Sequence, residues 1–485
     1  MLKKTAVFLS LIFILSFSCV FNGCKKPNEK VSSYNIEINL DGQTVRGSEE
    51  VIYFNSTETA ISTLKFNLYG NAFRKDAKFS PISAQYISHA YPNGVNYGDM
   101  KINSVLVEGE QTEFLIAGQD ENILLVPLKE EVFPDESVKV NVDFTLNLAN
   151  VIARTGINDK TINLANFYPI LCAWDREGFY ECVYYSKGDP FYSDIANYTV
   201  KITADKDYIV ASSGVKTSSV DNKNTLTQTY KINNARSFAF VLSKDFKVLS
   251  KEKNNTKIYY YYYEDENPEK TMEYAVKSID YFSNTFGEYI YESYSFVQTK
   301  FVQGGMEFSA LTMISDELNE KSFGEVIVHE TAHQWWQTAV GNNEIEYGFL
   351  DEGLTEYSVI LFYENHPEYS LSRESLVKSA EQTYKIFCSV SDKVFGKVDT
   401  KMIRNLKDFN GEYEYVNIAY IKPCIMYDTL RKTIGEKKFF NGLKDYYEKY
   451  KLKNATPYDL MGVYEKSGAD TNGFFQSFFD GKVII

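Results

Sequence analysis

Hydrophobic and polar residues alternate strictly in the N-terminal half of the chain. Between positions 138 and 148, Val, Phe and Leu at even positions alternate with Lys, Asn, Asp and Thr at odd positions. A period of two predicts a strand with one buried face. Shorter runs with this period occur at 34–40, 64–68 and 198–202, separated by turn-forming residues. We therefore predict a largely antiparallel β domain over residues 33–255.

The pattern changes after a polar break at residues 251–255. A β-prone run, Ile258–Tyr263, comes first, and a helix is expected between Pro268 and Gly287 because proline favours the first turn and glycine ends helices. Its apolar residues recur at helical spacing, namely Met272, Ala275, Ile279, Phe282 and Phe286. Helical patterns dominate the rest of the chain. We predict an α-rich second domain over residues 256–485, and an α+β fold overall.

Composition limits the class of protein and of partner. The chain has 485 residues, more than one hydrophobic core usually supports, which agrees with two domains. Hydrophobic residues make up 44% and charged residues 24%, the usual proportions of a globular protein. The formal net charge is −14, so the chain as a whole repels phosphate and we expect no nucleic-acid partner.

The N-terminus has the pattern of a secretion signal. Residues 1–23 contain two early lysines, an apolar run and no acidic residue, and the run is short for a membrane span. Gly23 precedes Cys24, which resembles the lipobox of bacterial lipoproteins, and Cys19 is a second candidate for lipidation. The alternative is an uncleaved signal anchor. We expect an exported protein, anchored by lipid to the outer face of a bacterial cell membrane, with residues 24–32 as a tether.

The four cysteines beyond this region have no metal or redox spacing. Cys172 and Cys182 flank a short segment that contains a glycine. In an oxidising compartment these two thiols can form a disulfide, and the alternative is that all four cysteines remain reduced.

Two of the four histidines lie within five residues of each other. His329, Glu330 and His333 form an HExxH motif in an apolar stretch compatible with a helix. Histidines at positions i and i+4 share one helical face, so both imidazoles can reach one Zn²⁺. Glu330 lies about 100° around the helix from His329, beside the metal position, which suits a general base that acts on water.

A third protein ligand is expected, because catalytic zinc sites leave the fourth position open. Glu352, in Asp351-Glu352-Gly353, follows His333 after eighteen intervening residues and is the candidate. Glu356 lies one helical turn later and can accept a proton from the outer nitrogen of a zinc histidine. An exposed position on the helix is the alternative for Glu356. One zinc ion held by two histidines and a glutamate indicates hydrolysis rather than a structural site.

These residues resemble the aminopeptidase N family of gluzincin metallopeptidases. That family combines HExxH, an eighteen-residue gap, a glutamate in an Asn/Asp-Glu-Gly motif, and an upstream Gly-x-Met-Glu-Asn segment. The upstream segment corresponds to Gly304, Gly305, Met306, Glu307 and Phe308, with Phe308 in place of the family's asparagine. The resemblance implies that Glu307 binds the free α-amine of a peptide. It also implies that Gly304, Gly305 and Met306 belong to an edge strand along the substrate cleft.

The same resemblance implies a catalytic tyrosine and a domain plan. The family's Tyr-x-Lys-Gly motif corresponds to Tyr420-Ile421-Lys422-Pro423, with Pro423 in place of glycine. Tyr420 is expected to donate its hydroxyl to the oxyanion of the tetrahedral intermediate. The resemblance also implies a saddle-like N-terminal β domain and a thermolysin-like catalytic domain. The chain looks like a compact two-domain version of the family, without the long helical C-terminal domain of larger members.

The sequence therefore predicts a zinc metallopeptidase of peptides, most simply an aminopeptidase. Glu307 would hold the peptide N-terminus while Glu330 transfers the proton. One alternative is a zinc endopeptidase that needs no free N-terminus. Another alternative, from a different class, is a catalytically silent protein that captures peptides at the cell surface. Retention of all three zinc ligands and of Glu330 argues against that last possibility.

Overall fold

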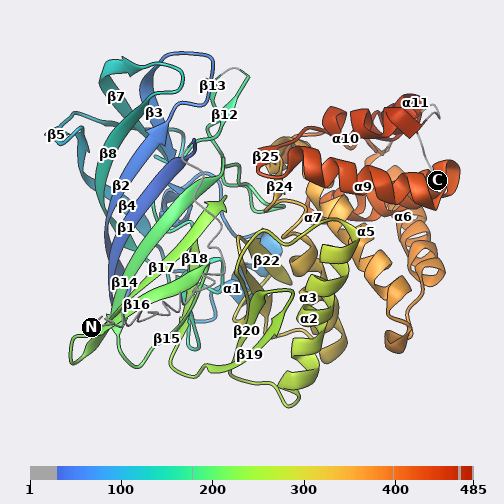
Figure 1. Ribbon diagram of the computed structural model, residues 1–485, viewed down its shortest axis with the longest axis horizontal. Helices are drawn as coiled ribbons and strands as arrows, with labels where there is room; N and C mark the ends of the chain where they lie inside the picture. The colour runs from blue at the N-terminus through green and yellow to red at the C-terminus, as the bar shows by residue number, and fades with distance from the viewer. Residues whose placement is uncertain (1–29, 177, 397, 468–470, 483–485) are drawn as a thin grey trace, which may run out of the picture.

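The computed structural model describes residues 30–176, 178–396, 398–467 and 471–482. The signal sequence predicted over residues 1–23, with Cys19 and Cys24, lies outside the described residues. Strands gather at one end of the molecule and helices at the other (Figure 1). The predicted α+β fold, with an N-terminal β domain and a C-terminal α-rich domain, is confirmed.

The N-terminal domain is built on a large twisted sheet. Its eight strands are, in spatial order, β16 (Val215–Asp221), β17 (Thr225–Ala235), β14 (Ala196–Asp205), β1 (Ser32–Asp41), β2 (Thr44–Phe54), β8 (Ser137–Asn147), β4 (Asp99–Val107) and β5 (Glu110–Gln111). Along β8 the even positions are buried and the odd positions are more exposed, as the period of two predicts. β1 and β14 pair in parallel, which differs from the predicted antiparallel arrangement. Because these two strands are far apart in the sequence, no local pattern could reveal their direction of pairing.

Smaller sheets complete the N-terminal domain. One four-stranded sheet has the order β15 (Ile209–Ser212), β18 (Ala239–Ser243), β10 (Ile162–Ala165) and β9 (Thr155–Ile157). A second has the order β11 (Ile170–Leu171), β3 (Ile61–Asn67), β7 (Ile123–Val132) and β6 (Leu115–Ala117). A short hairpin, β12 (Trp174–Asp175) with β13 (Gly178–Phe179), and one helical turn, α1 (Ile87–Ala90), also belong to this domain.

The second domain begins with a five-stranded sheet. Its order is β19 (Lys247–Lys253), β20 (Thr256–Tyr262), β21 (Ser293–Thr299), β23 (Leu311–Ser315) and β22 (Gly305–Phe308). The boundary predicted at residue 255 therefore falls inside a hairpin, because β19 pairs with β20 in this sheet and not with the N-terminal strands. The polar break in the sequence is the end and turn of that hairpin rather than a linker. A two-stranded pair, β24 (Val340–Gly341) with β25 (Lys453–Asn454), lies later in the domain.

Helices cover this sheet and form the rest of the domain. They are α2 (Pro268–Thr285), α3 (Glu320–Ala332), α4 (Glu344–Tyr347), α5 (Phe349–Asn365), α6 (Arg373–Phe395), α7 (Glu412–Val416), α8 (Lys422–Ile434), α9 (Glu436–Tyr450), α10 (Pro457–Tyr464) and α11 (Thr471–Phe479). α3 packs against β22 and β23 on one side and against α5 on the other. The edge strand, the HExxH helix and the helix that carries Glu352 are therefore neighbours.

Two further expectations concern the cysteines and the membrane. Cys172 and Cys182 are buried, and within the described residues both are free thiols rather than a disulfide. None of the helices in the described part of the chain combines the length and apolar character that a membrane span requires.

Candidate active site

The two histidines of the HExxH motif meet on one face of α3. The helix begins after Asn319, whose side chain accepts a hydrogen bond from the backbone nitrogen of Ser322, as a capping residue should. His329 lies in the last turn and His333 caps the C-terminus. Their Nε2 atoms are 3.1 Å apart. The i and i+4 spacing therefore directs both imidazoles to one point.

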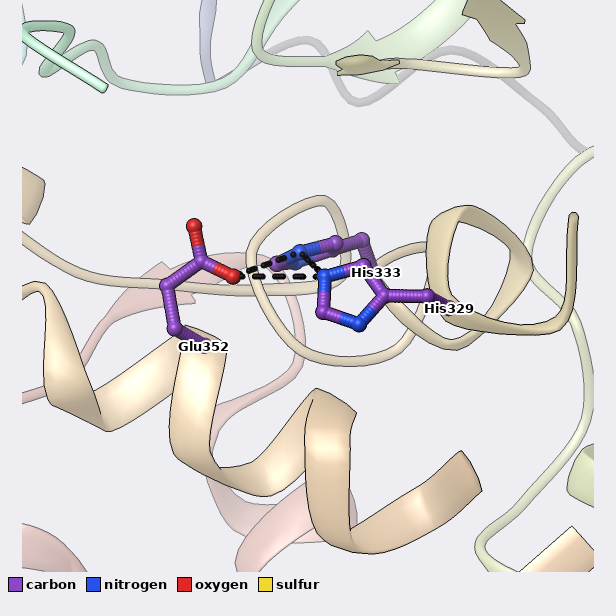
Figure 2. Close-up of side chains that lie close together, drawn as sticks. All are labelled: His329, His333 and Glu352. Carbon is purple, nitrogen blue, oxygen red and sulfur yellow. Dashed lines mark hydrogen bonds and ion pairs between the residues drawn. The ribbon is translucent and has the colours of Figure 1, made fainter. Parts of the chain in front are cut away.

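Glu352 reaches the same point from the first turn of α5. One carboxylate oxygen, Oε2, lies 3.1 Å from Nε2 of His333 and 3.4 Å from Nε2 of His329. Figure 2 shows the three side chains converging from two helices. Glu352 and His333 are almost fully buried, at 2% and 1% exposure. The three residues predicted to bind metal are thus brought together.

The distances between these atoms fit a zinc ion. Zinc binds histidine nitrogen and carboxylate oxygen at about 2.0–2.1 Å, so tetrahedral ligands are separated by about 3.3 Å. The three separations here are 3.1, 3.1 and 3.4 Å. Two imidazoles and one carboxylate are also the donors that zinc prefers in hydrolytic sites. The site therefore fits one Zn²⁺ held by His329, His333 and Glu352, with a fourth position for water or substrate.

The outer nitrogens of both histidines are fixed by hydrogen bonds. Nδ1 of His329 lies 3.0 Å from Oε2 of Glu356, the contact predicted from the sequence. Nδ1 of His333 lies 3.0 Å from the carbonyl oxygen of Trp336 and 3.2 Å from the hydroxyl of Thr355. When Nδ1 carries the proton and donates it, the lone pair of each Nε2 faces the metal position.

The electrostatics of the site favour a bound cation. Burial lowers the pKa of His329, but hydrogen bonds to Glu352 and Glu356 outweigh it and raise the pKa to about 10. Burial raises the pKa of Glu352, yet the two histidines hold it below its ordinary value. The raised pKa of His329 and the lowered pKa of Glu352 both show that the pocket stabilises positive charge next to an ionised carboxylate. A bound divalent metal ion is stabilised by the same electrostatic environment.

Glu330 lies beside the metal position with little room to move. It is 5% exposed, and no hydrogen bond reaches its Oε2 from any described residue. Burial raises the pKa of Glu330 to about 8. Gly305 on β22 faces the carboxylate so closely that a Cβ atom there would lie 2.2 Å from Oε1. A carboxylate of raised pKa that is not tied to another group is suited to accept and release a proton.

The strand β22 brings the predicted substrate-binding segment to the edge of the five-stranded sheet. It pairs antiparallel with β23, with Glu307 opposite Thr312. Glu307 is 3% exposed, and its Oε1 has no hydrogen-bond partner among the described residues. Gly304 and Gly305 line a cavity of about 540 Å³ together with His329, Glu330 and Tyr420. The edge position expected for this segment is therefore observed.

Tyr420 stands directly at the metal position. It belongs to a π-helical turn, Asn417–Ile421, between α7 and α8, and such turns often occur at functional sites. Its hydroxyl donates to Oε1 of Glu352 at 2.5 Å, and its ring stacks on His329 with centroids 5.9 Å apart. Lys422 of the same motif points elsewhere, because its ammonium donates to the carbonyl oxygens of Thr400 and Phe478. Lys422 therefore anchors the end of α11 rather than the reaction.

The N-terminal domain contributes two charged residues to the cavity that no sequence motif indicates. The guanidinium of Arg154 pairs with Asp189, and its Nε donates to the sulfur of Met306 at 3.0 Å. Arg154 and Asp189 both line the cavity. Arg154 is the single charged residue in a buried run from Val151 to Gly156. That isolated charge in an uncharged stretch is the signal by which the sequence could have indicated it.

The sequence itself carries a known domain. Residues 270–478 match the peptidase family M1 domain. This part of the chain is thus similar to the M1 peptidase domain. The matched segment spans both histidines, Glu330, Glu352, Glu307 and Tyr420.

Similar curated sequences belong to longer proteins. Leucine aminopeptidase 2 of Aspergillus fumigatus is 28% identical over 165 residues, which is 34% of this chain and 26% of that protein. A leukotriene A-4 hydrolase homolog of Botryotinia fuckeliana is 26% identical over 178 residues, covering 34% of this chain and 25% of that protein. The chain thus covers only 26% and 25% of the length of these two curated relatives.

Solved M1 structures share the whole two-domain fold. The M1 zinc metallopeptidase of Deinococcus radiodurans superposes with a TM-score of 0.64 and 14% identity, covering 95% of this chain and 96% of that one. A mutant of it bound to a Tyr-Ser-Ala substrate gives a TM-score of 0.65 at 15% identity with the same coverage. At this level of identity the likeness establishes the fold, including the compact two-domain plan.

Proposed function

We propose that this protein is a zinc-dependent aminopeptidase of peptidase family M1 that releases N-terminal residues from peptides. The observation that carries the proposal is the convergence of His329, His333 and Glu352 at distances suited to zinc. The Deinococcus structure with bound Tyr-Ser-Ala supports peptides as the substrate class. The alternative of a catalytically silent protein that captures peptides is disfavoured. Glu330 stands beside the metal ligands, and its Oε2 receives no hydrogen bond from the described residues, so it is available as a base.

Each residue has a distinct task in this reaction. Bound Zn²⁺ would supply Lewis acidity, polarising the scissile carbonyl and lowering the pKa of the attacking water. Glu330 takes a proton from that water as its oxygen attacks the carbonyl carbon. The same carboxyl then gives the proton to the leaving amine nitrogen as the C–N bond breaks. The Tyr420 hydroxyl donates a hydrogen bond to the oxyanion. To do so it gives up the hydrogen bond that it donates to Oε1 of Glu352.

Glu307 would set the position of cleavage. Its unpartnered oxygen can accept a hydrogen bond from the α-ammonium group of a peptide, so that only the first peptide bond reaches the metal position. The edge strand β22 offers backbone groups beside it for an extended substrate. An endopeptidase would need neither the free amine nor Glu307.

The proposal is tested with paired peptides, one with a free N-terminus and one N-acetylated, on zinc-loaded protein. We expect cleavage of the free peptide alone, and a loss of roughly 100-fold or more in Glu307→Gln. Glu317→Gln, at an exposed carboxylate that contacts His89, is the matched control and should keep full activity. Equal cleavage of both peptides, unaffected by Glu307→Gln, would establish an endopeptidase instead.

We further propose that the protein is exported and anchored by lipid at Cys24. The basis is the signal-like segment of residues 1–23 and the Gly23-Cys24 pair at its end. Mass spectrometry of the mature N-terminus should find diacylglycerol on Cys24, and Cys24→Ala should release the protein from the membrane fraction. Cys19→Ala should leave the anchor in place. A mature chain that keeps residues 1–23 would refute the cleavage.

A further inference from the structure

A second cavity lies between the two domains, apart from the metal position. Its volume is about 980 Å³, and it shares no lining residue with the cavity at the metal position. β15, β16 and β17 line it from the N-terminal domain, and β19 and β20 line it from the second domain (Figure 1). At its floor the hydroxyl of Ser295 donates to the carbonyl oxygen of Ser212 across the domain boundary. Domain interfaces are a preferred place for ligand sites.

The wall that the second domain contributes is made of tyrosines. Residues 259–263 are five consecutive tyrosines, of which the first four lie in β20. Tyr260 is fully buried, and its ring stacks on Phe296 at 4.4 Å between centroids. Successive side chains of a strand point to opposite faces, so Tyr259 and Tyr261 lie on the other face, where both are half-buried and line the cavity. Core packing explains Tyr260 but not this outer pair, whose ring centroids are 6.3 Å apart.

Two uncharged polar groups reach the same cavity. Ser293 is 3% exposed, and its Oγ has no hydrogen-bond partner among the described residues. Gln228 on β17 also lines the cavity, and its amide oxygen accepts a hydrogen bond from the hydroxyl of Tyr230 at 2.6 Å. This bond fixes the amide and leaves its NH₂ group to donate to a ligand. A buried hydroxyl without a partner is costly unless a ligand or water satisfies it.

The charged residues that line this cavity cancel one another. Three are basic and three are acidic, namely Lys206, Lys216, Lys257, Glu252, Glu288 and Glu292. Glu252 and Lys257 are direct cross-strand neighbours in the hairpin of β19 and β20. With no excess of either sign, the cavity attracts neither an anion nor a cation over long range. Its chemistry suits an uncharged ligand.

The two facing strands of the cavity present side chains rather than backbone. β17 lies between β16 and β14, and β20 lies between β19 and β21, so both are paired on each side. An extended peptide that adds to a sheet binds through the free backbone groups of an edge strand. A ligand held between β17 and β20 is therefore bound by aromatic rings, an amide and a hydroxyl.

We propose that this cavity is a second binding site, which holds an uncharged oligosaccharide. The C–H groups on the face of a sugar ring carry slight positive charge and pack on the negative face of a tyrosine ring. Successive sugars of one chain meet Tyr261 and Tyr259. The sugar hydroxyls, which both donate and accept, bond to the NH₂ group of Gln228 and to Oγ of Ser293. The site is separate from the peptidase reaction and does not depend on the proposed function.

The test is calorimetry on the zinc-loaded protein with three uncharged hexasaccharides: cellohexaose, maltohexaose and N-acetylchitohexaose. We expect saturable binding of at least one of them. The double variant Tyr259→Ala, Tyr261→Ala should weaken that binding at least roughly 10-fold, because two stacking surfaces are lost. Tyr458→Ala, at a tyrosine of α10 that is 51% exposed, is the matched control and should bind as the wild type does. Peptidase activity should be the same in all three proteins, since none of these tyrosines lines the cavity at the metal position.

The proposal is overturned if none of the three sugars binds, or if the double variant binds as tightly as Tyr458→Ala. Tighter binding of an uncharged Gly-Ser peptide of similar length would assign the cavity to peptides and overturns it too. Should the double variant fail to fold, wild-type crystals soaked in the sugar that binds decide. The sugar must lie on the rings of Tyr259 and Tyr261, and a sugar found elsewhere rejects the site.

Discussion

Gly305 and Glu330 are packed so closely that residue 305 has no room for a side chain. A Cβ atom built there would lie 2.2 Å from Oε1 and 2.7 Å from Cγ of Glu330. The edge strand and the HExxH helix can approach each other only because residue 305 is glycine. Glu330 in turn is held in one position beside the metal ligands.

Gly305→Ala should therefore displace the general base. We predict a fall in kcat of roughly 10²-fold with zinc content unchanged, because general acid–base catalysis contributes about 10²–10⁴-fold. Gly304→Ala is the comparison, since its Cβ would meet only Val326 at 3.6 Å, and it should lose far less. Steady-state kinetics beside zinc analysis measures both. Similar losses in the two variants would mean that the strand, not Glu330, had been disturbed.

Glu356→Gln should weaken zinc binding rather than the chemical step. The carboxylate orients His329 through a contact of 3.0 Å to Nδ1. Loss of such a partner typically costs about 10–100-fold in metal affinity or activity. Zinc dissociation constants, measured by competition with a chelating dye, should rise by that factor, while activity at saturating zinc largely recovers. An unaltered dissociation constant would show that Glu356 does not support the ligand.

Tyr420→Phe should slow the chemical step and leave the metal in place. Removal of one oxyanion donor costs about 10²–10³ in kcat. The phenyl ring keeps the stacking on His329, so folding and zinc content should be unchanged. We expect kcat to fall while KM changes little. If KM rises and kcat holds, Tyr420 contributes to substrate binding instead.

The buried carboxyl group of Glu49, in the N-terminal domain, should make the stability of the folded protein depend on pH. It lies in the middle of the large sheet, opposite Ile36 and Val142, fully buried, with neither oxygen hydrogen-bonded by a described residue. Burial raises its pKa well above the ordinary value. The unfolded chain releases this proton from pH about 4.3 upward while the folded protein keeps it, so stability is lost as pH rises toward the folded pKa.

Glu49→Gln removes that ionisation. The variant should be more stable than the wild type near neutral pH, by about 1.4 kcal/mol for each unit of pKa shift avoided, and the gap should close in mild acid. Urea unfolding at several pH values measures it. If the stability difference between Glu49→Gln and the wild type stays constant with pH, the pH dependence does not come from Glu49.

The sequence reveals local features of this fold better than distant ones. The period of two located β8, and the HExxH spacing placed His329 and His333 together, because both depend on neighbours along one element. The hairpin of β19 and β20 crosses the boundary predicted at residue 255, since the pattern of a strand does not reveal which strand it pairs with.

The same limit explains why some site residues emerge only from the structure. Arg154 and Asp189 meet across 35 positions and belong to no motif. Asp351 stands beside Glu352 in the sequence motif, but no spacing specifies that its side chain is buried.

The central claim is that His329, His333 and Glu352 hold a single zinc ion. The most direct measurement is the zinc content per chain, by mass spectrometry, of wild type and Glu352→Gln after chelation, zinc loading and buffer exchange. The account predicts one zinc per wild-type chain and almost none in the variant, which keeps the fold but lacks one of the three ligands. A wild-type chain that takes up no zinc, or a variant that retains a full equivalent, would contradict it.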